Sequence, residues 1–476
     1  MRTYQAKEIA EIVNGKIIAG ADTAEVADCS TDSRESGEML LFVPVIGERV
    51  DAHDFIADAY KNGMRVTFTS RGEVVPGTED MTYIQVEDTV AALQQFAAQV
   101  RSEYDIPVVG VTGSVGKTTT KEMIAAALSV GMKVLKTEGN MNSQVGLPKM
   151  MMRLNEEHEI AVIEMGMSLP GEMARLAKVA KPACAVLTNI GVSHIGQLGS
   201  KEKIRQEKLN IINELPERGV IIVNANDPLL AELKSARGRV GVDEVTKEKL
   251  VSHHIVTYGT DENADYRATD ISYMGDKTFF LLNKKNDVVM QPVILSALGE
   301  HNVLNALAAI AVAEYFEVEP KDAAKGLMAY NPPAMRGGRQ EKEGIIVIDD
   351  TYNASPDSMK GGIDILMATK AERHIAVLAD MLELGEFSES CHREVGAYLA
   401  TKKTIEAPEQ HADLLVAIGT EAKYYAEEAK GIEAHCFANN SEAMAFLKDF
   451  LKPGDAVLVK GSRGMHLEEI VDGILK

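Results

Sequence analysis

Apolar and polar positions alternate along the chain in a way that predicts strands and helices in turn. Near the N-terminus, short apolar runs at 39–44, 66–69 and 83–86 predict strands, and helical patterns separate them. From residue 108 onward, apolar runs at 161–164 and 185–188 are typical of buried parallel strands joined by helices. The pattern therefore indicates an α/β protein.

Two interruptions divide this pattern into three expected domains. The first is the sequence Tyr-Asp-Ile-Pro ending at Pro107, and the second is Val-Glu-Pro ending at Pro320. We expect an N-terminal α/β domain at residues 1–105, a central parallel-sheet domain at 106–318 and a C-terminal Rossmann-like domain at 319–476. In a doubly wound sheet such as the last one, ligands gather at the carboxyl ends of the strands.

Charge and cysteine content narrow the environment and the partners of the chain. Its 476 residues carry 50 Lys and Arg against 71 Asp and Glu, a net charge of −21, which disfavours nucleic acid and anionic membranes as partners. Four widely separated cysteines without a CxxC pair are typical of reduced thiols rather than of disulfides or zinc. No apolar run reaches about 18 residues, and the first residues lack a signal-peptide core. We therefore expect a cytoplasmic protein without membrane insertion, and the charge is compatible with a monomer.

A glycine-rich segment points to nucleotide binding, with ATP as the expected nucleotide. Residues 108–120 read VVGVTGSVGKTTT, a strand that enters a tight turn and opens a helix, where backbone N–H groups converge on phosphate oxygens. Lys117 can neutralise the terminal phosphates, and the Thr118 hydroxyl can bind Mg²⁺. Val111 stands where the strict GxxxxGK[ST] pattern has its first glycine, and a tight turn with an incidental lysine is the alternative. The expected phosphate contacts are Gly113, Ser114, Val115, Gly116, Lys117, Thr118 and Thr119.

Two further polar residues follow apolar strands of the central domain. Glu164 directly follows the strand expected at 160–163. Because Mg²⁺ prefers carboxylate and hydroxyl oxygens, Glu164 and Thr118 form a candidate metal site. His194 lies in the loop after the strand at 185–188, above the same sheet. The alternatives are a solvated glutamate at a strand end and a surface or packing histidine.

Several motifs in a fixed order give the chain a resemblance to a known family. They are VTGSVGKTTTK, TEGNMNSQVGLP, IEMGM, TNIGVSHIGQLGS, GEHNVLNALAA, DDTYNASPDSM and KGSRGMHLEEI. Together they resemble the Mur ligase family over nearly the whole chain. The resemblance implies a ligase of peptidoglycan synthesis that uses ATP to join a carboxylate to an amine through an acyl phosphate.

Two segments narrow the resemblance within the family. VLADMLELG at 377–385 and the TDSR and LFVPVIGERVDAHDF stretches between 31 and 55 resemble members that add D-alanyl-D-alanine to UDP-N-acetylmuramoyl-tripeptide. These molecules are the implied substrates, with the UDP-sugar on the N-terminal domain. The alternatives are a ligase adding the third amino acid to UDP-N-acetylmuramoyl-dipeptide, a folylpolyglutamate synthetase-like enzyme, and a non-catalytic P-loop switch or scaffold.

The resemblance also implies a set of metal and catalytic residues. It places a second Mg²⁺ near His194 and Lys208, and it implies that Lys208 is carbamylated, which converts a cationic amine into an anionic oxygen ligand. An exposed helical lysine is the alternative for Lys208. The expected catalytic residues are Lys117, Glu164, His194 and Lys208, and the expected metal ligands are Thr118, Glu164, His194 and Lys208.

The remaining implied contacts surround the nucleotide and the two substrates. Asn302 and Asn305 are implied to face the adenine, with helix capping by Asn302 as the alternative, and Asp350 is implied to bind the ribose. Arg339 resembles the family arginine that reaches the γ-phosphate, with Arg336 as a competitor. These placements put ATP between the central and C-terminal domains. The other implied contacts are Tyr352 and Asn353 for the nucleotide, and Ser33, Arg34, Asn140, Asn142, Ser143 and Lys460 for the substrates.

Overall fold

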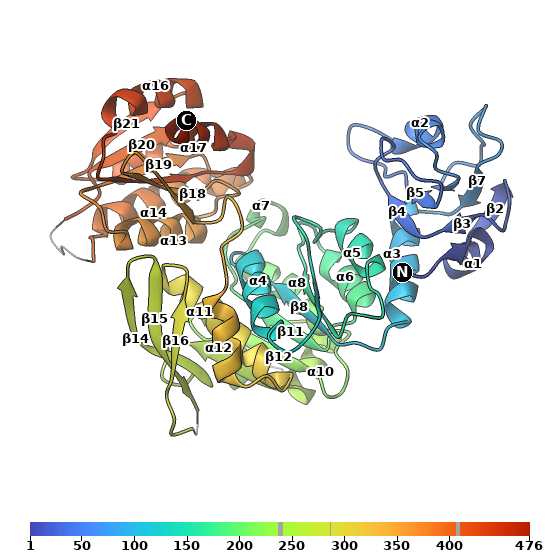
Figure 1. The fold of residues 1–476 in the computed structure, drawn as a ribbon, viewed down its shortest axis with the longest axis horizontal. Coiled ribbons are helices and arrows are strands. Elements are labelled where there is room, and N and C mark those ends of the chain that lie inside the picture. The colour runs from blue at the N-terminus through green and yellow to red at the C-terminus, as the bar shows by residue number, and fades with distance from the viewer. Residues whose placement is uncertain (237–240, 286, 406–409) are drawn as a thin grey trace.

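The computed structural model describes residues 1–236, 241–285, 287–405 and 410–476. They form three α/β domains, with the N-terminal and C-terminal domains on different sides of the central one (Figure 1). This architecture confirms the three-domain α/β fold expected from the sequence. Within the described ranges, no helix is long and apolar enough to cross a membrane.

The N-terminal domain is built on a five-stranded sheet in the order β2-β7-β6-β5-β4. Strands β4 to β7 pair in parallel, and β2 is antiparallel to β7. The three strands expected here are present, each within two residues of the expected ends. The elements are β1 (Tyr4–Gln5), α1 (Ala6–Ile12), β2 (Lys16–Ala19), β3 (Glu25–Val26), β4 (Asp28–Ser30), β5 (Leu40–Phe42), η1 (Ala52–Phe55), α2 (Ile56–Lys61), β6 (Val66–Thr69), β7 (Thr82–Gln85) and α3 (Thr89–Ser102).

Helix α3 joins the N-terminal domain to the central one. It begins where the Asp88 side chain accepts hydrogen bonds from the N–H groups of Val90 and Ala91, at 2.8 and 3.0 Å. Its buried face packs against two helices of the central domain, α5 (Gly146–Met152) and α6 (Glu172–Ala180). The packing fixes the N-terminal domain on the central one.

The central domain contains a nine-stranded sheet in the order β16-β15-β14-β13-β12-β11-β8-β10-β9. From β9 to β14 in this order, neighbouring strands are parallel. Strand β15 is antiparallel to both β14 and β16. The elements besides α5 and α6 are β8 (Val108–Thr112), α4 (Lys117–Leu128), β9 (Val134–Lys136), β10 (Ile160–Glu164), β11 (Cys184–Leu187), α7 (Ile195–Leu198), α8 (Lys201–Leu209), η2 (Asn210–Ile212), β12 (Val220–Asn224), α9 (Pro228–Ala236), α10 (Glu244–Ser252), β13 (His254–Gly259), β14 (Tyr266–Met274), β15 (Lys277–Lys284), β16 (Gln291–Leu295), α11 (Glu300–Tyr315) and α12 (Pro320–Met328).

Both faces of the parallel part of this sheet are covered by helices. Alternate residues of β10 show this, because Ala161 and Ile163 belong to the core on the side of α5 and α6. Ile160 and Val162 belong instead to the core on the side of α4 and α11. A strand that is buried on both faces has no polar alternation, which explains its continuous apolar run.

Helix α12 belongs to the central domain, although the expected boundary placed it in the C-terminal one. It packs on α4 and α11, and Ala323 and Leu327 lie in their core. The approach is so close that a Cβ on Gly326 would lie 2.2 Å from the carbonyl oxygen of Ala126. We therefore place the second boundary after Tyr330 rather than after residue 318.

The C-terminal domain contains a six-stranded sheet in the order β17-β18-β22-β19-β20-β21. All pairs are parallel except the edge pair of β17 and β18, and helices cover both faces, as in a doubly wound fold. The elements are β17 (Gly338–Lys342), β18 (Ile345–Asp350), α13 (Pro356–Ala368), β19 (Arg373–Ala379), η3 (Gly385–Phe387), α14 (Ser388–Thr401), β20 (Leu414–Ile418), α15 (Lys423–Glu428), β21 (Glu433–Phe437), α16 (Asn440–Phe450), β22 (Asp455–Lys460), η4 (Arg463–Met465) and α17 (Glu468–Leu475).

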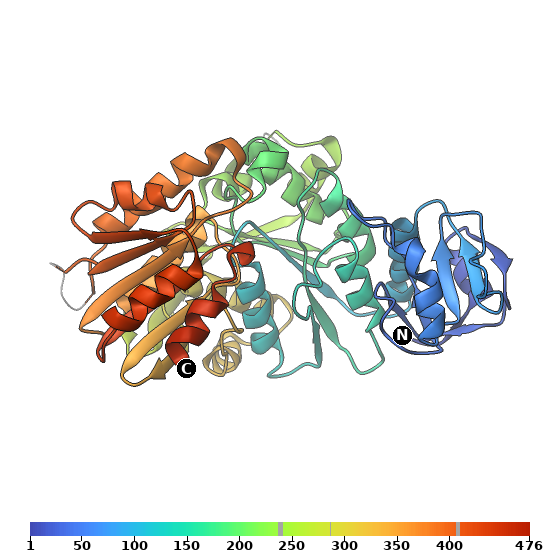
Figure 2. The same ribbon diagram turned by 90° about the horizontal axis from the view of Figure 1, so that it is seen from above.

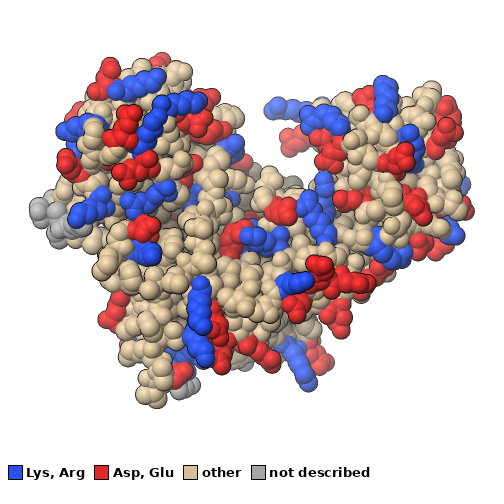
Figure 3. Space-filling view, in the orientation of Figure 1, with Lys and Arg blue, Asp and Glu red and all other residues tan. Residues whose placement is uncertain are grey.

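The three domains leave an open notch above the central domain. Figure 3 shows it between the N-terminal and C-terminal domains, with basic and acidic side chains interspersed on the visible face. Seen from above, the C-terminal domain lies beside the central one and the N-terminal domain extends away from both (Figure 2). The functional residues expected from the sequence lie mainly where the central and C-terminal domains meet.

Candidate active site

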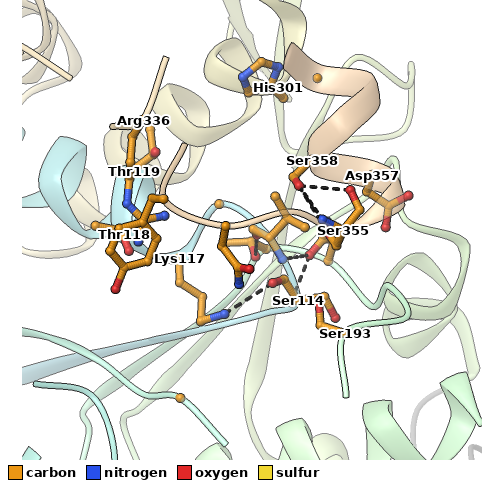
Figure 4. A pocket seen from close by; sticks show the side chains of 18 of the residues that line it. Ser114, Lys117, Thr118, Thr119, Ser193, His301, Arg336, Ser355, Asp357 and Ser358 are labelled. Carbon is orange, nitrogen blue, oxygen red and sulfur yellow. Dashed lines mark hydrogen bonds between the residues drawn. The ribbon is translucent and has the colours of Figure 1, made fainter. Parts of the chain in front are cut away.

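A cavity of about 550 Å³ lies between the central and C-terminal domains. Its central-domain wall is formed by the turn after β8, the ends of β10 and β11, and the start of α11. Its C-terminal wall is formed by the end of β18 and the first turns of α13. Figure 4 shows Lys117 and Ser114 on one side of a cavity, facing Ser355 and Asp357 on the other. Ligand sites at strand ends are expected for both sheets.

A second cavity of about 690 Å³ adjoins the first. The two share a set of lining residues that includes Lys117, Thr118, Asn140, His194 and Arg336. From there the first cavity extends to the start of α11, and the second extends to residues 382–384 and 462–464 of the C-terminal domain. The shared residues are therefore the place where a ligand in one cavity meets a ligand in the other.

The glycine-rich turn between β8 and α4 has the shape of a phosphate-binding loop. Gly113 has φ +151° and Gly116 has φ +85°, and a Cβ on Gly113 would lie 1.8 Å from the Thr188 hydroxyl. Helix α4 begins at Lys117, so its first N–H groups have no acceptor within the helix and point toward the cavity end of the turn. Backbone donors at a helix N-terminus favour an anion such as a phosphate.

Thr118 and Glu164 come together as expected for a metal site. The Thr118 hydroxyl donates to Glu164 Oε2 at 2.8 Å, and Asn142 Nδ2 donates to Glu164 Oε1 at 2.7 Å. Glu164 is only 3% exposed, and in the described part of the chain no cation lies within 4 Å of its carboxylate. The two hydrogen-bond partners of this buried carboxylate are neutral, and the nearby charge of Lys117 acts on it without a direct ion pair. Mg²⁺ with its preference for oxygen ligands fits such a site.

Lys117 and Lys208 both reach the same backbone carbonyl of the phosphate-binding loop. Lys117 Nζ donates to Gly113 O at 2.8 Å, and Lys208 Nζ donates to it at 2.9 Å. Lys208 is 2% exposed, so it is not the exposed helical lysine that the sequence allowed. Burial lowers the pKa of Lys117, and burial together with the charge of Lys117 lowers the pKa of Lys208 well below its ordinary value.

His194 lies at the contact between the central and C-terminal domains. It precedes α7 with φ +62°, and its Nδ1 is 3.4 Å from Glu383 Oε2 of the C-terminal domain. Burial and the nearby Lys117 lower the pKa of His194, which favours the neutral ring that can bind a metal. His194 lines both cavities, whereas Lys208 lies behind the loop and lines neither.

The two asparagines of α11, Asn302 and Asn305, line the first cavity only, whereas residues 382–384 line the second only. Asn305 Oδ1 accepts from the Thr120 hydroxyl at 2.9 Å, and Asn302 Nδ2 donates to Leu298 O at 2.7 Å. The residue that caps α11 is Gly299, so Asn302 does not cap the helix. Both asparagines are buried and line the cavity, as expected for contacts to a base.

Asp350 and Lys460 form a charged pair at the ends of two neighbouring parallel strands. The register places Asp350 of β18 opposite Lys460 of β22, and Lys460 Nζ lies 2.5 Å from Asp350 Oδ2. Lys460 also donates to Asn353 O at 3.0 Å. The family resemblance implied a substrate contact for Lys460, and these bonds direct its ammonium to the Asp350 side of the first cavity. Its ammonium supports the residues expected to bind the ribose.

Arg336 rather than Arg339 faces the cavities. The Arg336 guanidinium stacks on the Tyr352 ring, 3.8 Å from the ring centroid, and both residues line both cavities. Arg339 lies on β17 and directs its guanidinium toward Gly275 O, outside both cavities. The family resemblance favoured Arg339 for the phosphate contact, with Arg336 as the competitor. Because β17 carries Arg339 away from both cavities, Arg336 fits this contact better. Asn353 lies beside Tyr352 in both cavities.

The loop between β9 and α5 supplies the expected amide groups. Asn140, Asn142 and Ser143 all line the first cavity, and Asn140 lines the second as well. Asn142 holds Glu164, whereas the Ser143 hydroxyl accepts from Gly146 N at 3.2 Å and closes the loop onto α5. Asn140 is therefore the amide of this loop that faces both cavities.

Ser33 and Arg34 lie in the N-terminal domain and line neither cavity. Arg34 forms a two-pronged contact with Asp32, with Nε–Oδ1 2.8 Å and Nη2–Oδ2 2.6 Å, and its side chain is 87% exposed. The Ser33 carbonyl accepts from Asn62 Nδ2 at 2.8 Å. Their role toward a uridine diphosphate stays a prediction.

Several residues that were not candidates on sequence grounds also line the first cavity, and three of them carry polar side chains at strand or helix ends. Asn189 lies in the loop after β11, His301 lies in the first turn of α11, and Asp357 lies in the first turn of α13. Each of them lies inside one of the quoted motifs. Their positions after a strand or in the first turn of a helix could have marked them as candidates, because ligands of such sheets bind at these ends.

Comparison with known proteins identifies the family. The Mur ligase middle domain matches residues 111–313, and the Mur ligase glutamate ligase domain matches residues 336–463. The chain therefore belongs to the Mur ligase family, as the sequence resemblance predicted.

Two curated relatives that match this chain over nearly its full length carry the name UDP-N-acetylmuramoyl-tripeptide–D-alanyl-D-alanine ligase. The Bacillus subtilis enzyme of that name is 38% identical over 99% of this chain and 98% of its own, and the Escherichia coli enzyme is 33% identical over the same shares.

Two solved structures of MurF ligases are also similar to this chain over nearly its full length. The MurF structure from Acinetobacter baumannii matches with a TM-score of 0.87 and 31% identity, covering 100% of this chain and 99% of its own. MurF ligase from Thermotoga maritima, solved in complex with ADP, matches with a TM-score of 0.79 and 30% identity, covering 94% and 96%.

Proposed function

We propose that this chain uses ATP to join D-alanyl-D-alanine to UDP-N-acetylmuramoyl-tripeptide, giving the pentapeptide precursor of peptidoglycan. The observation that carries the proposal is the meeting of two cavities at Lys117, Thr118 and His194. A reaction between a nucleotide and two further substrates needs such a junction, because the phosphate donor must reach a carboxylate that an amine then attacks. The full-length similarity to ligases of that name supports the choice of substrates.

The proposed reaction has two balanced steps. In the first, a carboxylate oxygen of the tripeptide forms a bond to the γ-phosphorus while the bond to ADP breaks. In the second, the dipeptide amine attacks the acyl carbon, phosphate leaves with its oxygen, and the nitrogen loses a proton. Lys117 and Arg336 supply positive charge at the cavity junction, where the transferring phosphate carries negative charge.

Thr118 and Glu164 are proposed to hold one Mg²⁺, and His194 and Lys208 are proposed to hold a second. Bound Mg²⁺ neutralises phosphate oxygens and allows the carboxylate to approach them. The buried Glu164 carboxylate, whose hydrogen-bond partners are both neutral, supplies the anionic oxygen that such a site needs. We propose that Lys208 supplies an oxygen ligand as a carbamate, formed when its neutral amine adds to carbon dioxide and releases a proton. Burial of Lys208 favours the neutral amine that this addition needs.

The two substrates of the ligation are proposed to enter from different sides. The first cavity continues past Asn140 to Gln144 and Glu172, near the helices that carry the N-terminal domain, and we assign this branch to the tripeptide. Ser33 and Arg34 of that domain would bind the uridine diphosphate. The second cavity continues to residues 382–384 and 462–464, and we assign it to D-alanyl-D-alanine.

The wall of the second cavity is held firmly. Asp380 accepts hydrogen bonds from the N–H groups of Glu421 and Ala422, at 3.1 and 2.7 Å, and so fixes the start of the 381–385 loop on the N-terminus of α15. Leu382 N donates to Ser462 Oγ at 2.8 Å and joins the two segments of the wall. A rigid wall of this kind suits recognition of a small dipeptide.

We infer that the protein acts as a monomer. We also infer a cytoplasmic location, because both the nucleotide donor and a UDP-linked substrate are available there. Sedimentation of the purified protein with its substrates tests the first of these statements. A stable dimer whose dissociation abolishes turnover would contradict it.

Phosphate release tests the proposed activity. The enzyme is incubated with ATP, Mg²⁺ and UDP-N-acetylmuramoyl-tripeptide, with and without D-alanyl-D-alanine, and the product is weighed by mass spectrometry. We expect release that depends on both substrates and a product heavier by the dipeptide minus one water. Turnover only with UDP-N-acetylmuramoyl-dipeptide and a free amino acid would show a different ligase of the family. ATP binding without turnover on any acceptor would favour a switch or scaffold.

A further inference from the structure

Asn189, in the loop after β11, is bonded directly to the phosphate-binding loop. Its side-chain Oδ1 accepts hydrogen bonds from the N–H groups of Ser114 and Val115, at 3.0 and 2.8 Å. The N–H of Ser114 also lies 3.0 Å from the main-chain oxygen of Asn189. Because two backbone donors point at one atom of the amide, that atom is the oxygen.

The residues on either side of Asn189 hold the same loop. The Thr188 hydroxyl donates to Val115 O at 2.5 Å, and Gly191 N donates to the Ser114 hydroxyl at 2.8 Å. We call residues 188–191 the strap. The strap is itself fixed from the next strand, since Asn224 Nδ2 donates to Thr188 O at 2.9 Å.

These bonds divide the donors of the phosphate-binding loop into two groups. The N–H groups of Ser114 and Val115 are taken by the strap. Among the residues that the structure describes, the N–H groups of 116–119 have no hydrogen-bond acceptor, and they lie at the N-terminus of α4. The second group is therefore the one left for phosphate oxygens.

We propose that Asn189 is a positioning residue that holds residues 114 and 115 in place, so that the N–H groups of 116–119 converge on the phosphates of ATP. It keeps its two hydrogen bonds when the nucleotide binds. The opposite role would be a placeholder, whose oxygen occupies a phosphate position and is displaced by ATP. The main-chain bond from Ser114 to the same residue, and the flanking bonds of Thr188 and Gly191, favour the positioning role because the amide is part of a fixed segment.

The two roles predict opposite effects on nucleotide affinity. We expect Asn189→Ala to weaken the binding of a non-hydrolysable ATP analogue about tenfold, the size expected when the acceptor of two backbone hydrogen bonds is lost. A displaced placeholder predicts tighter binding in the same variant, because ATP would no longer compete with the amide. Calorimetric titration without either acceptor substrate measures this affinity, so the result does not depend on the proposed ligation.

A graded series and a matched control complete the test. Asn189→Ser, whose hydroxyl can accept one of the two hydrogen bonds, should bind the analogue with intermediate affinity. If the alanine variant does not fold, the affinity of the serine variant decides between the two roles. Asn226→Ala removes another strand-end asparagine, which bonds Thr260 and lines neither cavity, and should stay within about twofold of the wild type.

Steady-state kinetics separate positioning from a general structural role. In Asn189→Ala the KM for ATP should rise about tenfold, while kcat at saturating ATP and the KM for the second substrate change by less than about threefold. Unchanged or tighter binding of the analogue by the alanine variant would overturn the proposal. An equal loss in both KM values and in kcat, with a lowered melting temperature, would also overturn it.

Discussion

Replacing Lys460 by Met tests whether the charged pair at the strand ends holds the nucleotide-binding edge of the C-terminal domain. The Lys460 side chain is 2% exposed and that of Asp350 is 19% exposed, with 2.5 Å between Nζ and Oδ2. Removing one partner of a buried pair typically costs about 3 to 5 kcal/mol, because the remaining charge is left unpaired. Asp350 can regain some water, so we expect Lys460→Met to cost about 3 kcal/mol, at the lower end of that range.

Removing the other partner, Asp350, should lower the stability of this edge more. Asp350→Ala leaves the ammonium of Lys460 in a place with almost no exposure, and only the carbonyls of Asn353 and residue 350 remain to solvate it. We expect a loss of about 4 to 5 kcal/mol for this variant. The double variant should be more stable than Asp350→Ala alone, because it buries no unpaired charge.

Local amide exchange is the suitable assay, because the chain has no tryptophan and three domains obscure a single unfolding transition. Amide exchange of peptides that cover β18 and β22, measured by mass spectrometry, reports the stability of this edge of the sheet. The control is Lys448→Met, which removes the charge of an exposed lysine. The KM for ATP should rise about tenfold in Lys460→Met as Asp350 loses its orientation. A loss of local stability below about 1 kcal/mol in Lys460→Met would refute the reasoning. A double variant whose loss of stability equals the sum of the two single losses would refute it as well.

Further predictions concern the metal, the phosphate and the carbamate. Glu164→Gln should keep the fold but lower Mg²⁺-dependent turnover at least about 100-fold, and wild-type turnover in excess chelator should fall likewise; retained turnover would exclude Glu164 as a metal ligand. Arg336→Lys should lower kcat about 30-fold or more, whereas Arg339→Lys should stay within about twofold, and the reverse order would restore the assignment made from the sequence. Labelled bicarbonate should give a carbamate carbon signal that Lys208→Met abolishes, and full activity of that variant without added bicarbonate would contradict the carbamate.

The sequence was sufficient to predict several strands of the sheets and the position of the glycine-rich turn between β8 and α4. Strands such as β10 and β11 are apolar throughout because helices cover both sides of the sheet, and this produces runs that can be recognised without coordinates. The glycine-rich turn and Glu164 follow such strands directly. Parallel strands end at the same edge, so their carboxyl-end residues could be expected to converge.

Three features could not be obtained in this way, because each depends on contacts between distant segments. Helix α12 has an apolar face that could pack on either domain, and only the structure shows that it packs on α4 and α11. Lys208 lies in a charged helix, and its burial depends on the distance of α8 from Gly113. The pairing of Lys460 with Asp350 follows from the register of β18 and β22, which no local pattern specifies.

The transfer of oxygen from the tripeptide carboxylate to phosphate tests the central claim most directly. UDP-N-acetylmuramoyl-tripeptide labelled with ¹⁸O in its terminal carboxylate is converted with ATP and D-alanyl-D-alanine, and the released phosphate is analysed by mass spectrometry. An acyl-phosphate route at the junction of the two cavities predicts one ¹⁸O in each phosphate and one fewer in the peptide product. Phosphate without ¹⁸O, formed in step with the pentapeptide product, would contradict the account.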